Sequence, residues 1–139
     1  MRRYVIASHA HLAWGMRESL ALLTGNVDNV YALCLFVDGN DNPEAAIAEL
    51  LASFDDEDEV VVCTDLLGGS VNNAFACVIA QRPGTLLVTN TNLAFMLELL
   101  CAGEDGPLDE TIRLVLSEGR CSVSYVNDLI DIVGADEDF

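Results

Sequence analysis

Short apolar runs alternate with segments of helical pattern along the chain, and this alternation constrains the fold more than any other feature. The runs are continuous rather than interrupted by polar residues, which is typical of strands covered on both faces. They occupy residues 4–7, 30–37, 60–64 and 86–89, and helical patterns follow at 11–23, 43–53, 70–81 and 92–101. Strands that alternate with helices predict an α/β fold with a parallel sheet and right-handed crossovers.

Capping residues mark several of the predicted helix boundaries. Asn42 precedes a proline, and Ser70 and Asn92 begin later helical patterns, so all three are predicted N-caps. Gly25 and Gly103 are predicted to end the first and fourth helices, because glycine readily adopts the left-handed conformation found there.

The last part of the chain has a different pattern. A fifth helix is predicted over 108–118, and residues 121–126 then alternate apolar and polar side chains. Such alternation predicts a strand with one buried face or an edge strand, either parallel in the same sheet or antiparallel and donated to a partner subunit. We expect one domain over 1–134, followed by a loose acidic tail over 135–139.

The charge and the cysteines limit the compartment and the partners. The net charge is −17, which argues against nucleic acid or an anionic membrane surface as a partner. It fits either solubility alone or the steering of a basic protein partner. Five cysteines without CxxC spacing indicate reduced thiols and a cytoplasmic protein. We find no leader pattern, no apolar run long enough for a membrane span, and no nucleotide-binding motif, so no cofactor is expected.

Polar residues gather where the predicted strands end. Ligands of open α/β sheets bind beyond the carboxyl ends of the strands. His9 follows the first strand and Asp65 the third, and Gly68, Gly69 and Ser70 lead into the next helix. Two glycines before a helix start allow backbone amides to approach an anion closely. The same residues also fit an ordinary turn with a serine cap.

His9 is the candidate nucleophile of this group. A carboxylate such as Asp65 can fix the tautomer of an imidazole and leave its other nitrogen free to react. Together with the amides near Ser70, this group of residues can hold a phosphohistidine without a metal or nucleotide. His11 provides an alternative, because His9, His11 and Asp65 would suit a zinc site. His11 otherwise faces solvent or a partner.

Three segments carry a resemblance to a known family. Residues 8–15 (SHAHLAWG) resemble the SHGxLAxG segment of the IIA components of the mannose family of the bacterial phosphoenolpyruvate-dependent sugar phosphotransferase system. Residues 65–74 (DLLGGSVNNA) resemble that family's DxxGGSPxNxA, and residues 90–98 (NTNLAFMLE) resemble its GVNLPMLLE. The resemblance covers about residues 3–120 with the same element order.

The resemblance implies a phosphotransferase that works through phosphohistidine. His9 would accept a phosphoryl group from the phosphocarrier protein HPr and pass it to a IIB component (EIIB). The membrane components IIC and IID would be reached only indirectly. Asp65 would orient the imidazole, and Gly68, Gly69 and Ser70 would bind the phosphoryl oxygens. It also implies a three-layer fold with strand order 2-1-3-4 and an antiparallel C-terminal strand exchanged within a homodimer.

Some residues depart from the family pattern, and two related functions stay open. Ala10, Val71 and Ala94 replace a glycine and two prolines, and Asn90 replaces another glycine. If the family's glycine at this position has a positive φ, either Ala10 is strained or the turn differs. The alternatives are a phosphoryl donor for a dihydroxyacetone kinase and a non-catalytic regulatory module that binds an anion or a metal.

Overall fold

The strands form one parallel sheet with the predicted order. The structure, a computed structural model, describes residues 1–67 and 69–133, without the side chains of 131–133. The strands run in the order β2-β1-β3-β4, and every pairing is parallel. Their bounds are Arg2–His9 for β1, Val30–Leu35 for β2, Glu59–Thr64 for β3 and Leu86–Val88 for β4. Strand β1 is therefore central, and β4 lies at one edge.

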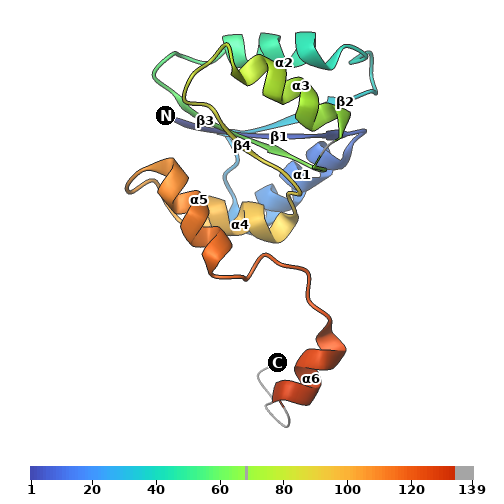
Figure 1. The fold of residues 1–139 in the computed structure, drawn as a ribbon, viewed down its shortest axis with the longest axis vertical. Helices are drawn as coiled ribbons and strands as arrows, with labels where there is room; N and C mark the ends of the chain where they lie inside the picture. Colours follow the sequence, from blue (N-terminus) through green and yellow to red (C-terminus); the bar gives the residue numbers. More distant parts are fainter. Residues whose placement is uncertain (68, 134–139) are drawn as a thin grey trace.

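Helices cover both faces of this sheet, which gives the predicted three layers (Figure 1). Helices α2 and α3 lie on one face, and α1, α4 and α5 lie on the other. The bounds are Leu12–Thr24 for α1, Pro43–Ala52 for α2, Ser70–Ile79 for α3, Leu93–Cys101 for α4 and Leu108–Ser117 for α5. A sixth helix, α6, spans Val126–Val133.

Alternate residues of the central strands supply two separate cores. Tyr4 and Ile6 pack with α1, α4 and α5, whereas Val5 and Ala7 pack with α2 and α3. Because successive side chains of a strand point to opposite faces, a continuous apolar run fills both cores at once. The buried Cys63 belongs to the first core, and its burial raises the pKa of its thiol to about 12.

Three of the predicted caps are confirmed at helix ends. The Asn42 side chain accepts a hydrogen bond from the amide of Ala45, and Asn92 does the same for Phe95. Gly25 has a φ of 81° at the end of α1. The prediction for Ser70 is wrong, because Ser70 is the first helical residue and Gly69 is the N-cap. The Ser70 hydroxyl is therefore not engaged as a cap.

A buried arginine ties the amino end of the sheet to the α4–α5 connection. The side chain of Arg2 is only 3% exposed, and its guanidinium donates to Glu59 and to the carbonyl oxygens of Gly103 and Gly106. A buried charge is tolerated when it is paired and its donors are satisfied. Arg2 thus holds the loop between α4 and α5 against the amino end of the sheet.

The predicted C-terminal strand does not form in this single chain. Residues 121–125 are irregular and lead into α6, and in the described part of the chain no antiparallel strand pairs with the sheet. The segment runs away from the body of the molecule (Figure 1), and the Val123 side chain is 97% exposed. An alternating pattern needs a partner strand, and in this single chain the segment lies away from the sheet. The predicted tail over 135–139 lies outside the described residues.

Candidate functional site

The predicted site residues meet at the carboxyl edge of the sheet. His9 is the last residue of β1, Asp65 follows β3, and Ser70 begins α3. Because β1 and β3 are parallel neighbours, their carboxyl ends lie side by side. The chain connectivity therefore brings residues that are 56 and 61 positions apart into contact.

His9 and Asp65 make two hydrogen bonds through the same carboxylate oxygen. The Nδ1 atom of His9 lies 3.0 Å from Oδ2 of Asp65, and the backbone amide of His9 donates to that oxygen at 2.9 Å. A carboxylate can only accept, so Nδ1 carries the proton and Nε2 carries the lone pair. The second oxygen of Asp65 accepts from the amide of Leu66, which fixes the carboxylate itself.

These contacts also set the charge of Asp65. Burial by itself raises the pKa of the Asp65 carboxyl, but hydrogen bonds from the amide and the ring of His9 outweigh it. The resulting pKa lies below its ordinary value, so the group is ionised at neutral pH. A fixed negative charge beside Nδ1 favours a positive charge on the imidazole, which a nucleophilic attack through Nε2 would create.

The other ring nitrogen faces the start of α3. The hydroxyl of Ser70 lies 3.3 Å from Nε2 of His9, a long contact in which the hydroxyl is the donor. A Cβ placed on Gly69 would lie 3.4 Å from Cε1 of His9, so the backbone passes close to the ring. The first amides of a helix lack intrahelical partners and attract anions. Gly68, also predicted to bind a phosphoryl group, lies outside the described residues.

His11 belongs to a different pair. Its Nε2 atom lies 2.7 Å from Oδ2 of Asp38, and both side chains are mostly exposed. Among residues 1–67 and 69–133, no cluster of three or more His, Cys, Asp or Glu side chains could hold a metal ion. The zinc alternative built on His9, His11 and Asp65 thus lacks its geometry in the described part of the chain.

Three further residues shape the site and were not predicted to be site residues. Ser8 accepts a hydrogen bond from the amide of Ala13 at 2.8 Å and so anchors the start of α1 behind His9. The Asn90 side chain accepts from the amide of Leu67 and holds the turn before α3. A serine beside a helix start and an asparagine at a strand end are recognisable signals for such roles.

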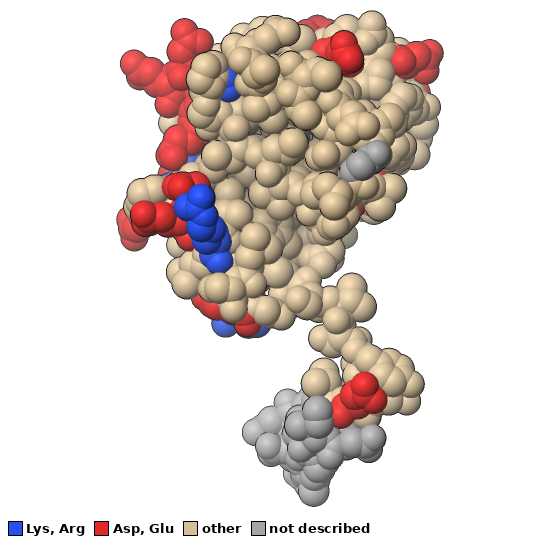
Figure 2. All heavy atoms as spheres, viewed as in Figure 1, with Lys and Arg blue, Asp and Glu red and all other residues tan. Residues whose placement is uncertain are grey.

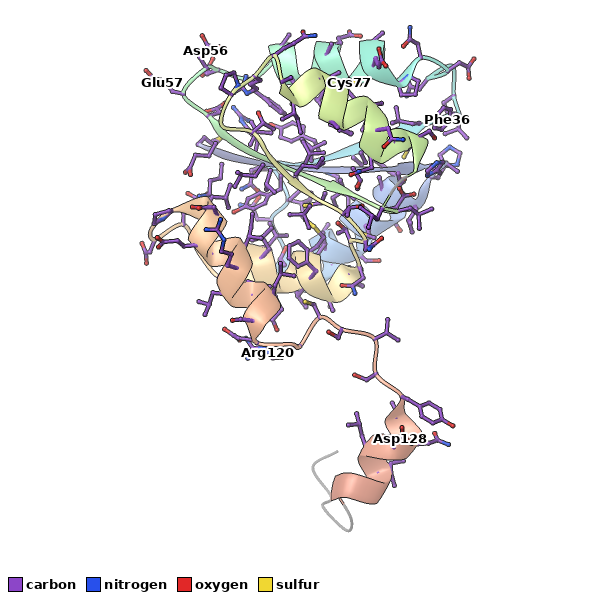
Figure 3. All side chains as sticks on the ribbon, viewed as in Figure 1. Phe36, Asp56, Glu57, Cys77, Arg120 and Asp128 are labelled. Carbon is purple, nitrogen blue, oxygen red and sulfur yellow. The ribbon has the colours of Figure 1, made fainter. Side chains whose placement is uncertain are left out.

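The third of these residues, Phe36, follows β2, and its ring stacks on His9 with a centroid distance of 5.6 Å and an interplanar angle of 24°. Phe36 and Ser70 also line one groove of about 530 Å³ between α2 and α3, which extends to Cys77. No sequence signal identifies this stacking, because it depends on an irregular loop. Figure 3 labels Phe36 and Cys77 on this side of the molecule.

Two of the residues that replace a glycine of the family pattern, Ala10 and Asn90, lie at backbone positions that favour glycine. Ala10 has a φ of 53° and Asn90 a φ of 56°, both in the left-handed region that glycine adopts freely. The conditional prediction of strain at Ala10 therefore applies. Asn90 is the milder replacement, because asparagine is enriched in this region.

Comparisons with known proteins identify the family of this chain. Residues 3–116 match the model of the EIIA-man family, described as PTS system fructose IIA component. The chain is 33% identical over 97 residues to the sorbose-specific EIIA component of Klebsiella pneumoniae, covering 69% of this chain and 70% of that protein. It is 27% identical over 110 residues to the fructose-specific EIIA component of Bacillus subtilis, covering 78% and 75%.

Two solved structures of sugar phosphotransferase components have a similar fold. A phosphoenolpyruvate-dependent sugar phosphotransferase system permease of Klebsiella pneumoniae superposes with a TM-score of 0.85 at 31% identity, covering 93% of each chain. The mannose/sorbose-specific IIA subunit of Enterococcus faecalis shares the fold, with a TM-score of 0.77 at 21% identity over 89% of this chain and 93% of that one.

The fold and the comparisons together identify the class of this protein. It is an EIIA phosphocarrier component of the sugar phosphotransferase system (PTS). Within this class, the chain belongs to the EIIA-man family. Within residues 1–67 and 69–133, every helix falls short of the length and apolar character that a membrane crossing requires.

Proposed function

We propose that this chain carries a phosphoryl group on Nε2 of His9, receives it from HPr and delivers it to a IIB component. The observation that supports this assignment best is the convergence of His9, Asp65 and Ser70 within 3.0 and 3.3 Å contacts at one sheet edge. One nitrogen of the ring is held by a carboxylate, and the other is directed to a helix start. This is the arrangement that a nucleophilic imidazole requires.

The transfer itself exchanges one nitrogen–phosphorus bond for another. The lone pair on Nε2 of His9 forms a bond to phosphorus while the bond to the donor's imidazole nitrogen breaks, and that electron pair returns to the donor ring. The proton on Nδ1 stays in its hydrogen bond to Asp65, which stabilises the positive charge that develops on the ring. Delivery to the IIB component follows the same steps in reverse. Catalysis of this kind depends mainly on positioning and electrostatics.

The phosphoryl oxygens would bind at the start of α3. Ser70 contributes its hydroxyl, and the backbone amides from Gly69 onward contribute donors and the positive end of the helix dipole. We include Gly68 in this cradle on the sequence motif alone. No metal or nucleotide is needed for this scheme.

The surroundings of the site favour docking of a protein partner. Leu12, Leu66 and Leu67 are 51%, 56% and 69% exposed, so they do not belong to the core. Exposed apolar side chains grouped beside a reactive group are typical of an interaction surface. We expect these leucines to contact HPr and IIB in turn.

The acidic run of residues 55–59 lies at the opposite edge of the sheet from this docking surface. Residues 55–59 precede and begin β3, at the amino edge of the sheet, opposite His9. Figure 3 shows Asp56 and Glu57 at that far edge, and Figure 2 shows mostly uncharged atoms on the visible surface between the two edges. The run therefore does not border the proposed docking surface, and its role in solubility is the better supported one.

We also propose that 121–126 pairs with the β4 edge of a second copy in a homodimer. Strand β4 has one unpaired edge, and the exposed apolar side chains of Val123 and Tyr125 are suited to one-sided burial. Residues 1–134 would then form one EIIA mannose-type domain, acting in the cytoplasm, with 135–139 as its acidic tail. Light scattering of the purified chain tests this: a dimer that persists after deletion of 121–139 would contradict the exchange.

The decisive experiment for the carrier function is incorporation of labelled phosphate from phosphoenolpyruvate through enzyme I and HPr. We expect one phosphoryl group per chain, acid-labile as phosphohistidine is. His9→Ala abolishes incorporation, whereas His11→Ala reaches full stoichiometry; His11 is the matched control because the chain has only these 2 histidines. Full labelling of His9→Ala would refute the assignment.

Discharge of the labelled protein then tests the recipient. Addition of a IIB component should remove the label, and a dihydroxyacetone kinase should not. The reverse result would favour the kinase alternative, and a wild-type chain that takes up no label would favour a non-catalytic regulatory module.

A further inference from the structure

The ring of Phe36 lies over one face of the His9 imidazole, although Phe36 belongs to neither core. The two rings are stacked at 5.6 Å, within the range of attractive aromatic pairs. Phe36 is 41% exposed and is absent from both clusters of buried residues. Burial of its side chain in a core therefore does not account for its position.

The backbone at Phe36 is in an unfavourable conformation. Phe36 has a φ of 65° and Asp38 a φ of 55°, in a region that L-residues other than glycine rarely adopt. The loop is fixed by a 2.9 Å hydrogen bond from the Phe36 amide to the carbonyl of Asn40, whose side chain donates to Cys34. Strained backbone of this kind clusters at functional sites when surrounding contacts enforce it.

The His11–Asp38 pair connects the same loop to the turn that follows His9. His11 immediately precedes α1, and Asp38 lies two residues beyond Phe36, so their 2.7 Å contact joins both sides of the site. The amide of Ala10 also donates to the carbonyl of Leu35, the residue before Phe36. The loop that carries Phe36 is thus held at two points against the turn that follows His9.

We propose that Phe36 is a positioning residue for phosphoryl transfer, and that the His11–Asp38 contact holds its loop in place; this inference rests on the proposed function. Asp65 fixes one edge of the imidazole. Phe36 packs on one face and so blocks rotation of the ring, which keeps Nε2 directed to Ser70. The electron-rich face of the phenyl ring also attracts the positive charge that develops on the imidazole during transfer.

Replacement by glycine separates this role from folding. Phe36→Gly relieves the left-handed strain but loses a partly buried ring and adds freedom to the unfolded chain, so the variant should melt near the wild-type temperature. The single-turnover rate of phosphorylation at saturating phospho-HPr should nevertheless fall roughly tenfold, because small displacements of a reacting group are costly. Phe36→Tyr keeps the ring and should recover the rate.

A second measurement does not depend on activity. In NMR spectra of Phe36→Gly, the nitrogen-15 shifts of His9 should show the loss of its single Nδ1–H tautomer. The ring protons of His9 should lose the upfield shift that the phenyl ring causes. Neither change is expected in Phe36→Tyr. An unchanged His9 spectrum, or a change in the KM for phospho-HPr with the saturated rate unaltered, would overturn the positioning role; the latter would mean that Phe36 serves docking alone. Failure of the wild-type chain to accept phosphate would instead defeat the proposed function.

A double-mutant cycle tests the His11–Asp38 contact. Asp38→Gly removes the contact while glycine retains the left-handed φ, so the rate should fall in the same direction as in Phe36→Gly, by a smaller factor. If the pair acts only by holding Phe36, the double variant should be no slower than Phe36→Gly alone. Multiplicative losses would refute that connection.

Discussion

Ala10 is the clearest case in which a single side chain works against the backbone conformation of the site. Its φ of 53° places it in the left-handed region, which costs an alanine roughly 1–2 kcal/mol. The contacts of its backbone do not involve the methyl group: the amide donates to Leu35 at 2.9 Å, and the carbonyl accepts from the Ser8 hydroxyl at 3.2 Å. Glycine at this position would keep both contacts.

We therefore expect Ala10→Gly to stabilise the protein. Relief of the left-handed strain is partly offset by the greater freedom of glycine in the unfolded chain, roughly 0.5–1 kcal/mol. The net gain in the free energy of unfolding is about 0.5–1 kcal/mol, which corresponds to an increase of about 2–4 °C in Tm for a domain of this size. Because Ala10 is exposed, the loss of its methyl group removes little packing.

Ala48 provides the matched control, since it is exposed in the interior of α2 with helical backbone. There the same substitution should lower the free energy of unfolding by about 1 kcal/mol. Thermal and urea unfolding of both variants would measure the difference. If Ala10→Gly proved neutral or destabilising while Ala48→Gly behaved as expected, the strain assigned to Ala10 would be absent.

Two further predictions concern ion pairs and pH. Arg2→Met should lower the free energy of unfolding by about 2–3 kcal/mol in urea titrations, because the carbonyl groups of Gly103 and Gly106 lose their donor; a loss below about 0.5 kcal/mol would contradict this role. For Asp65, the pKa of the folded state lies below the ordinary value of 3.8, so its stabilisation is present above that pH and disappears as the pH falls through the folded-state pKa. The free energies of unfolding of wild type and Asp65→Asn should accordingly differ at pH 7 and become equal in acid. A difference in the free energy of unfolding that stays constant down to pH 2 would exclude the linkage.

The sequence predicted the parts of the site that depend on chain connectivity. Continuous apolar runs predict that β1 and β3 are parallel strands covered on both faces, so His9 and Asp65 lie at the same edge of the sheet; that the two strands are neighbours was implied by the family resemblance alone. The Gly-Gly-Ser turn indicated a helix start there, although Ser70 proved to be the first helical residue rather than the cap.

The remaining features depend on information that a local pattern does not contain. The stacking of Phe36 follows from left-handed backbone in its loop, which no residue type at position 36 signals. The alternation over 121–126 is the same for an edge strand and for an extended segment without a partner, so the sequence could not distinguish them. The apolar character of Leu66 and Leu67 does not show whether they are buried either, and only the position of the turn makes them 56% and 69% exposed.

The central position of β1 gives the reacting residue an unusual setting. His9 ends a strand that is hydrogen-bonded to neighbours on both sides, whereas Phe36 approaches it from an irregular loop and Ser70 from the first residue of α3. Amide protons of such a strand exchange with solvent only through rare, extensive opening, while turns open often. A docking partner can therefore reshape the walls around the imidazole without disturbing the backbone that carries it.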